Sequence, residues 1–338
     1  MEMHRLIAMD IETKDPNLHD LGDGSIRGDG YILCCGAHGE GISKVFDFSN
    51  PNDIQACKDI VEDPDIDLIF HNGLYDLSWM YNFYGFRPKG IMHDTMTRAA
   101  LIDEYQSLGL DDCCKRLGVT GKNKAETIEA WWSERQVLFK KLAKGLKKYD
   151  VIIDPDTMEQ YNLNDLELES LITGNYKKDV WANVDIVWND REGRELMKKY
   201  NLQDCIATYN LFKAQEPKMK GLERVYALEC KLIPILLEMK RVGIRIDEKA
   251  LHELTDKVQC KYDEAEQKLI EMYGITGEMI NSSKQLGARF NEMNIQSPVK
   301  TKTGAQSWSA DALARIHHPV IPLIQEFKNY DAILNKYL

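Results

Sequence analysis

The sequence lacks several features that would assign it to common classes of protein. Its apolar runs, such as residues 232–237, are far too short to cross a bilayer. The residues before Asp10 include too few apolar positions for a secretory signal. The eight cysteines contain no C-x-x-C pair and no Cys/His spacing typical of zinc sites. We therefore expect a soluble, cytoplasmic protein with reduced and mostly buried thiols.

An excess of positive charge and a phosphate-binding glycine pattern are also missing. The chain has 43 Lys and Arg against 54 Asp and Glu, which gives a net charge of −11. This balance argues against strong non-specific DNA binding but not against a metal-dependent nuclease, because bound cations would offset part of the negative charge. The glycines of residues 22–30 fit neither the G-x-G-x-x-G pattern nor a P-loop.

Short segments rich in Ile, Leu, Val, Cys and Phe alternate with helical patterns in the first two thirds of the chain. The segments predicted as strands are residues 4–9, 31–36, 42–48, 66–71 and 90–93. This order implies an α/β fold with a mixed sheet flanked by helices. A further helix is predicted through Tyr200 to about residue 214.

A boundary is predicted at residues 215–217, where Gln, Glu and Pro follow that helix. We expect one domain over residues 1–216 and a second, mainly helical segment over residues 217–338. Residues 119–190 include a predicted helix over residues 123–148 and an irregular, acidic stretch, and we interpret them as an insertion.

Two carboxylate motifs accompany the first and fourth predicted strands. Asp10 and Glu12 flank Ile11, and since side chains alternate along a strand they should project from one face, at the carboxyl end of the strand. Asp76 follows the strand at residues 66–71 and lies near the start of a helix.

A third motif places a phenol and a carboxylate four residues apart. Tyr200 and Asp204 share one face of the predicted helix, because residues four apart on a helix are neighbours. Tyr161 and Asp165 repeat this spacing within the insertion. We favour Tyr200 and Asp204 because apolar residues extend their helix on both sides.

Four carboxylates in one cleft would repel one another and raise their pKa values unless cations balanced them. Magnesium ions prefer oxygen ligands, and two such ions can stabilise both the attacking and the leaving oxygen of a phosphodiester. The motifs therefore favour two Mg²⁺ ions, with Mn²⁺ able to substitute.

These motifs resemble those of the DEDD exonuclease superfamily, in the subgroup whose third motif contains Tyr. The likeness is to the 3′–5′ proofreading domain of phage-type family A (Pol I-like) DNA polymerases. The three matching motifs are residues 9–13, 70–76 and 200–204, and residues 93–95 and 108–118 are similar to the family's middle segments. The resemblance implies a ribonuclease H-like fold with a five-stranded sheet.

The resemblance extends beyond the exonuclease motifs. Residues 228–247 resemble the entry to the polymerase region, and residues 281–286 and 300–304 resemble its thumb. No palm or fingers motif is found, so we expect no polymerase activity from this chain alone. The remaining polymerase portion, in the same gene or as a separate chain, is an expected partner.

The resemblance also implies roles for individual residues. Asp10, Glu12 and Asp204 would bind the first ion, with Asp10 bridging to a second ion that Asp76 holds through water. Tyr200 would orient the attacking water.

Further residues are expected to contact the DNA. The residues implied to bind substrate are Thr13, His71 and Asn72 at the terminal nucleotide, and Asn281, Lys300 and Lys302 at backbone phosphates. A hydrogen-bonded histidine at the end of a strand is an equally good interpretation of His71.

The sequence thus predicts a two-metal-ion 3′–5′ exodeoxyribonuclease that releases 5′-nucleotides from frayed or single-stranded 3′ ends during DNA replication. It would lie in the host cytoplasm if a phage encodes it. Two alternatives remain: an RNA exonuclease of the same superfamily, and a non-catalytic module that binds DNA or a polymerase.

Overall fold

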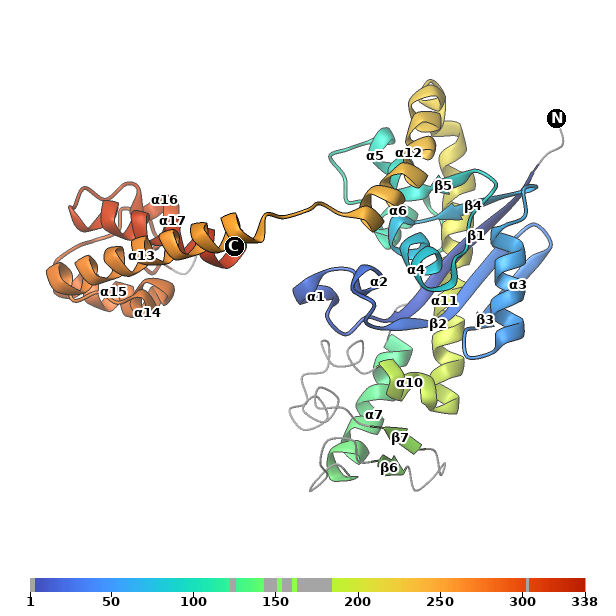
Figure 1. Cartoon of the computed structure of the whole chain (residues 1–338), viewed down its shortest axis with the longest axis horizontal. Coiled ribbons are helices and arrows are strands. Elements are labelled where there is room, and N and C mark those ends of the chain that lie inside the picture. Colours follow the sequence, from blue (N-terminus) through green and yellow to red (C-terminus); the bar gives the residue numbers. More distant parts are fainter. Residues whose placement is uncertain are drawn as a thin grey trace. The chain divides into compact units, whose positions relative to one another are not determined.

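A computed structural model gives the structure of the chain, which forms two compact units, Met1–Gly243 and Ile244–Leu338 (Figure 1). We describe each unit by itself. The residues described are 4–121, 126–142, 151–153, 160–162, 184–301 and 304–337.

A five-stranded mixed sheet forms the centre of the first unit, in the strand order β3-β2-β1-β4-β5. Strands β3, β2 and β1 pair antiparallel, whereas β1, β4 and β5 pair parallel. The strands are β1 (Arg5–Lys14), β2 (Tyr31–Gly39), β3 (Ile42–Asp47), β4 (Ile66–Phe70) and β5 (Met92–Asp94). The predicted mixed sheet of five strands is confirmed.

Strand β1 is longer than the sequence predicts. Its antiparallel pairing with β2 continues through Thr13 and Lys14, so Asp10 and Glu12 lie inside the strand and not at its end. The prediction of strand-end carboxylates was therefore wrong. The strand continues through these polar residues because β2 forms backbone hydrogen bonds with them.

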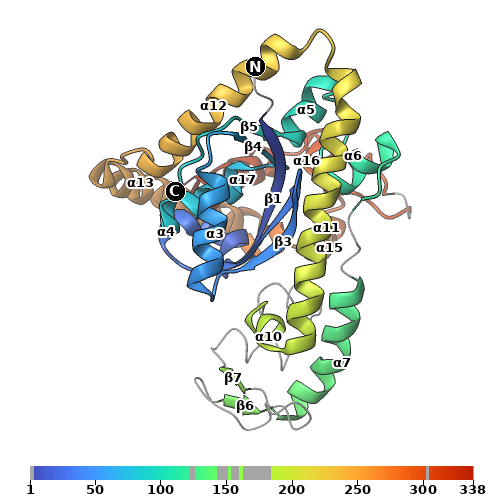
Figure 2. The ribbon, with the colours of Figure 1, turned by 90° about the vertical axis from the view of Figure 1, so that its right-hand side faces the viewer.

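The two faces of the sheet have different covers, as Figure 2 shows for helices α3 and α11. Ile7, Met9 and Ile11 of β1 belong to the core that contains α3 (Pro51–Val61) and α4 (Leu74–Tyr84). Ala8 instead packs with Phe212 of α11 (Arg191–Gln215). Since side chains alternate, Asp10 and Glu12 share the face with α11.

Side-chain caps define where the main helices begin. Asn50 accepts from the Asn52 amide at the start of α3, and Asp190 accepts from the Gly193 amide at the start of α11. The remaining elements of this part of the unit are α1 (Leu18–Leu21), α2 (Gly24–Arg27), α5 (Thr95–Ile102), α6 (Leu110–Leu117), α7 (Glu126–Leu142), β6 (Val151–Ile153), β7 (Gln160–Asn162), α10 (Val184–Asn189) and η1 (Glu216–Met219).

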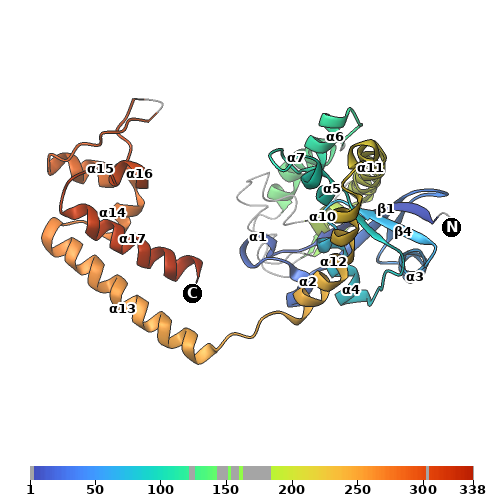
Figure 3. The same ribbon diagram turned by 90° about the horizontal axis from the view of Figure 1, so that it is seen from above.

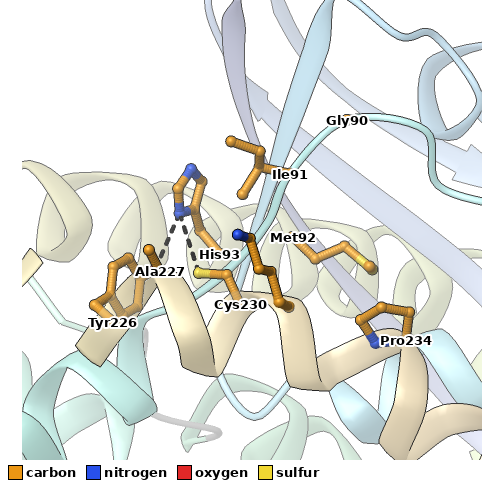
Figure 4. A pocket seen from close by; sticks show the side chains of 9 residues that line it. Gly90, Ile91, Met92, His93, Tyr226, Ala227, Cys230 and Pro234 are labelled. Carbon is orange, nitrogen blue, oxygen red and sulfur yellow. Dashed lines mark hydrogen bonds between the residues drawn. The ribbon is translucent and has the colours of Figure 1, made fainter. Parts of the chain in front are cut away.

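Helix α12 (Glu223–Val242) also belongs to the first unit, so this unit extends past the predicted boundary at residues 216 and 217. The rings of His93 in β5 and Tyr226 in α12 stack, with Nδ1 of His93 3.0 Å from the Tyr226 hydroxyl (Figure 4). Between β5 and α12 lies a mainly apolar pocket of about 340 Å³, lined in part by Met92, Cys230 and Pro234.

The second unit is helical and has a core of its own, which confirms the prediction of a mainly helical segment. Its long helices α13 (Glu248–Tyr273) and α17 (Val320–Lys336) pack side by side (Figure 3). Shorter helices complete it: α14 (Gly277–Asn281), α15 (Ser283–Glu292) and α16 (Ala310–Leu313). Phe290, Phe327 and Leu269 are among its fully buried side chains.

Two expectations from composition can be checked against this fold. Among the described residues, no helix is both long enough and apolar enough to pass through a bilayer. Of the eight cysteines, six are buried, Cys230 is partly buried and only Cys260 is exposed, which confirms that the cysteines are mostly buried.

Candidate active site

Three of the four predicted carboxylates meet in one place. Oxygens of Asp10 and Glu12 on β1 and of Asp204 on α11 all lie within 4.8 Å of one another. Asp204 is 2% exposed, and Asp10 and Glu12 are half-buried. A cluster this tight and this buried needs compensating positive charge, and its oxygen ligands fit a hard divalent cation.

A β-bulge lies directly beside this cluster. The register between β1 and β2 shifts after Glu12, which pairs with Cys34, while Thr13 pairs with Ile32. Leu33 is the extra residue on β2. Such bulges change the direction of nearby side chains and are common next to active sites.

Gly36 allows helix α11 to approach the sheet closely. It pairs with Asp10 across the strands, and a Cβ atom at this position would lie 2.5 Å from Oδ1 of Asn201 and 2.6 Å from Sγ of Cys205. Any larger residue would have to displace these two buried side chains or the helix that carries them. The missing side chain at Gly36 therefore helps to bring Asp204 within reach of β1.

Asp76 lies beside the cluster and is tied to the strand that carries it. The parallel pairing of β1 with β4 ends at Ala8 and Ile69. Further along the same strand, the amide of Ile11 donates to Oδ1 of Asp76 at 3.0 Å. Asp76, which is 7% exposed, thus contacts the residue between Asp10 and Glu12 without joining the group of three.

The turn that leads to Asp76 is fixed by the end of β5. Asn72 adopts a left-handed conformation with φ of 67°, which asparagine tolerates better than most residues. The Gly73 amide donates to the buried Asp94 carboxylate at 2.7 Å, and Nδ1 of His71 lies 2.8 Å from the Thr95 hydroxyl. The structure therefore supports the interpretation of His71 as a hydrogen-bonded histidine at a strand end.

Thr13 belongs to a short chain of hydrogen bonds near the cluster. Its hydroxyl lies 2.7 Å from that of Tyr75, which donates to Asp15 at 3.2 Å. Burial is the main cause that raises the pKa of Tyr75, so its phenol stays protonated. This chain links the strand after Glu12 to the helix that carries Asp76.

The negative charge of the cluster reaches the thiols beneath it. Burial, followed by the charges of Asp10, Asp204 and Asp76, raises the pKa of Cys205. Burial, followed by the charges of Glu12 and Asp10, raises the pKa of Cys34. Both thiols therefore remain neutral and add no further anion to the site.

Tyr200 lies one helical turn before Asp204 on α11 and is half-buried against the cluster that contains Leu33 and Trp188. The competing residue Tyr161 is in β7, and Asp165 lies outside the described residues. Two of the three residues predicted to contact phosphates are described, and both belong to the second unit. Asn281 and Lys300 are exposed there, whereas Lys302 lies outside the described residues.

Sequence reasoning missed two residues that shape the site. Asn201 donates to Asp10 from α11, and Asp94 holds the turn before Asp76. Asn201 lies at helical spacing from Met197, Asp204 and Cys205 on the buried face of α11. A polar residue at such a position was the sign in the sequence that could have pointed to Asn201.

Comparison with known proteins assigns the class. A family model described as a 3′–5′ exonuclease matches residues 1–149. Residues 1–149 therefore match the 3′–5′ exonuclease domain of the family A DNA polymerases. That family is metal-dependent, in agreement with the carboxylate cluster.

Individual relatives are DNA polymerases. DNA polymerase DpoZ of Vibrio phage phiVC8 is 26% identical over 88% of this chain and 45% of its own length. DNA polymerase I of Caldicellulosiruptor bescii is 31% identical over 51% of this chain and 19% of its own length. The chain thus spans less than half the length of either relative.

Among solved structures, the polymerase domain of Pol1 from M. smegmatis, in complex with a DNA primer-template and dNTP, resembles 99% of this chain. The TM-score is 0.56, the identity is 16%, and 46% of that chain is covered. The shared fold and the matched family confirm the predicted ribonuclease H-like exonuclease fold followed by helices.

Proposed function

We propose that this chain is a two-metal-ion 3′–5′ exodeoxyribonuclease that acts as the proofreading part of a family A DNA polymerase. The observation that carries the proposal is the approach of Asp10, Glu12 and Asp204 to within 4.8 Å of one another. The family of residues 1–149 supports the reaction class. Mg²⁺ is the proposed ion, with Mn²⁺ as a substitute, because all three ligands are carboxylates.

Each residue of the site has a proposed role. Asp10, Glu12 and Asp204 would hold the first cation, and Asp10 together with Asp76, through water, would hold a second. When bound, the pair of cations would stabilise the attacking and the leaving oxygen of the phosphodiester. Tyr200 would orient the attacking water by its hydroxyl and would not act as the base, because a free phenol is a poor base at neutral pH.

Substrate contacts are proposed in both units. Thr13, His71 and Asn72 would contact the terminal nucleotide, and Asn281, Lys300 and Lys302 would contact phosphates. The substrate is a frayed or single-stranded 3′ end of DNA. The remaining polymerase portion, on the same or another chain, is the proposed partner, because the relatives are longer DNA polymerases.

The test is cleavage of a 5′-labelled DNA primer in Mg²⁺, with and without EDTA. We expect stepwise shortening from the 3′ end that EDTA abolishes. Asp10→Ala and Asp204→Asn should each lower kcat/KM at least about 100-fold, or ~2.7 kcal/mol of transition-state stabilisation. Asp59→Asn is the matched control, because Asp59 is exposed on α3 over the opposite face of the sheet.

The same assay separates the alternatives. An RNA exonuclease would degrade a matched RNA oligonucleotide faster than the DNA. A non-catalytic module would bind the primer but show no EDTA-sensitive cleavage. Rates near those of the unchanged chain in folded Asp204→Asn would contradict the assignment of the cluster.

A further inference from the structure

Asn201 is a fully buried amide next to two residues of the proposed site. It is 0% exposed, directly follows Tyr200 and precedes Asp204 by three positions on α11. Residues three apart on a helix are neighbours, so Asn201 and Asp204 face the sheet together. A buried amide on such a face must be hydrogen-bonded, or it destabilises the fold.

The amide nitrogen of Asn201 donates twice to the same residue. Nδ2 lies 2.9 Å from the carboxylate oxygen Oδ2 of Asp10 and 3.1 Å from the carbonyl oxygen of Asp10. An NH₂ group has two hydrogens, which suffice for both acceptors. The two bonds together connect the backbone of Asp10 to its own carboxylate, and so restrict the rotation of this side chain.

The orientation of this amide follows from its surroundings. If the amide were flipped, Oδ1 would face two oxygens of Asp10. Three hydrogen-bond acceptors would then lie together with no donor between them. In the observed orientation Oδ1 points towards Gly36, where an added Cβ would be 2.5 Å away. Oδ1 has no hydrogen-bond partner among the described residues, so the bonds to Asp10 fix the orientation.

Gly36 and Asn201 form a matched pair around Asp10. Gly36 is the partner of Asp10 in the antiparallel register, and its missing side chain leaves the space that Asn201 and Cys205 occupy. Without a donor at position 201, repulsion from Glu12 and Asp204 would turn the Asp10 carboxylate away from the others.

We infer that Asn201 is a positioning residue that holds the Asp10 carboxylate in the orientation needed to bind a divalent cation, and that Gly36 admits it. This inference rests on the proposed function, since it concerns the same cluster. Groups that orient metal ligands in this way typically change metal affinity about 10- to 100-fold when they are removed.

The test measures Mn²⁺ binding directly, by the electron paramagnetic resonance signal of free Mn²⁺ in titrations of the full chain without DNA. Asn201→Leu keeps the approximate volume and removes both donors. We expect its Kd for Mn²⁺ to rise about 10- to 100-fold. Gln203→Ala is the matched control, because this amide on the same helix donates to the Gly121 carbonyl at 3.2 Å and not to a carboxylate.

Two further variants guard against misfolding. Asn201→Ser is smaller and cannot reach Asp10, so it should also weaken Mn²⁺ binding. Gly36→Ala keeps Asn201 but should displace its amide, because the added Cβ would lie 2.5 Å from Oδ1. This variant should raise the Kd for Mn²⁺ without any change at residue 201. Thermal unfolding followed by circular dichroism identifies which variants are folded.

The outcomes distinguish this inference from the proposed function. Weaker Mn²⁺ binding in a folded Asn201 variant, with an unchanged Gln203→Ala, supports the positioning role. Mn²⁺ affinity within twofold of the unchanged chain in folded Asn201→Leu or Asn201→Ser overturns it and leaves the proposed metal site intact. If the wild-type chain binds no Mn²⁺ at millimolar concentration, both the positioning role of Asn201 and the proposed metal site are overturned.

Discussion

At the scale of single residues, His93 shows how the fold determines the charge of a side chain. The ring is buried between Phe212 and Tyr226. Burial, followed by the charge of Arg98, lowers its pKa to about 4, and the charges of Asp67 and Glu216 only partly oppose this shift. His93 is therefore neutral in the folded protein at neutral pH, and its contribution is structural.

This shift predicts how stability depends on pH. The unfolded chain binds a proton at His93 near pH ~6.5, whereas the folded protein binds it only near pH 4. Acid therefore favours the unfolded chain. The contribution of His93 to the free energy of unfolding should fall by about 2 kcal/mol between pH 7 and pH 5. Urea unfolding of wild type and His93→Gln checks this, with exposed His252→Gln as control. Equal losses in all three proteins would contradict it.

Single residues also show how far sequence reasoning reaches. The alternation of a strand was enough to place Asp10 and Glu12 on one face, and the predicted helix does contain both Tyr200 and Asp204. The role of Asn201 was not predictable, because its acceptor lies 191 positions away in the sequence. Such contacts depend on which helix crosses which strand, and local patterns do not encode that choice.

At the scale of elements, the end of β1 is joined to α10 by a buried ion pair. Nζ of Lys14 lies 2.7 Å from Oδ2 of Asp185, and the two side chains are 8% and 18% exposed. The Tyr31 hydroxyl at the start of β2 also donates to Asp185. The pair therefore connects both central strands to the helix that immediately precedes α11.

Removing one charge of this pair should cost more than removing both. Asp185→Asn leaves the Lys14 ammonium buried without its counter-charge and should destabilise the first unit by about 3–5 kcal/mol. Lys14→Met combined with Asp185→Asn should cost clearly less, because Asn can still accept from Tyr31 and no charge remains buried. Urea unfolding of these two variants and of the wild-type chain measures this. A double variant at least as unstable as Asp185→Asn would contradict the prediction.

Element boundaries were predicted less well than element types. The five strands and the helix containing Tyr200 were expected, but β1 extends to Lys14 because β2 continues to pair with it. The first unit likewise includes α12, since Tyr226 and Leu237 pack against distant parts of the chain. Hydrophobic periodicity identifies a helix well, but it does not say which core the helix joins.

At the scale of the whole molecule, each unit has its own buried core. Among the described residues, the hydrophobic clusters around the sheet contain residues up to Leu237 only, and the cluster with Phe290 contains residues of the second unit only. Domains with separate cores can fold independently. A fragment of residues 1–243 should therefore retain a cooperative unfolding transition and the proposed EDTA-sensitive nuclease activity.

A fragment that ends at the boundary predicted from sequence should behave differently. Residues 1–216 lack Tyr226 and Leu237, which are 6% and 7% exposed in the first unit. Loss of these two side chains should cost about 3–6 kcal/mol. The guanidinium of Arg98 would also lose the Tyr226 ring 4.6 Å away.

Urea unfolding of the two fragments, together with limited proteolysis, tests this difference. We expect residues 1–216 to unfold at a lower urea concentration than residues 1–243 and to be cleaved faster. Tyr226→Ala and Leu237→Ala in the longer fragment should each reproduce part of the loss, because each removes one of the two contacts. If residues 1–216 are as stable as residues 1–243, the packing of α12 on β5 and α4 does not stabilise the exonuclease domain, and the boundary predicted from the sequence is the better one.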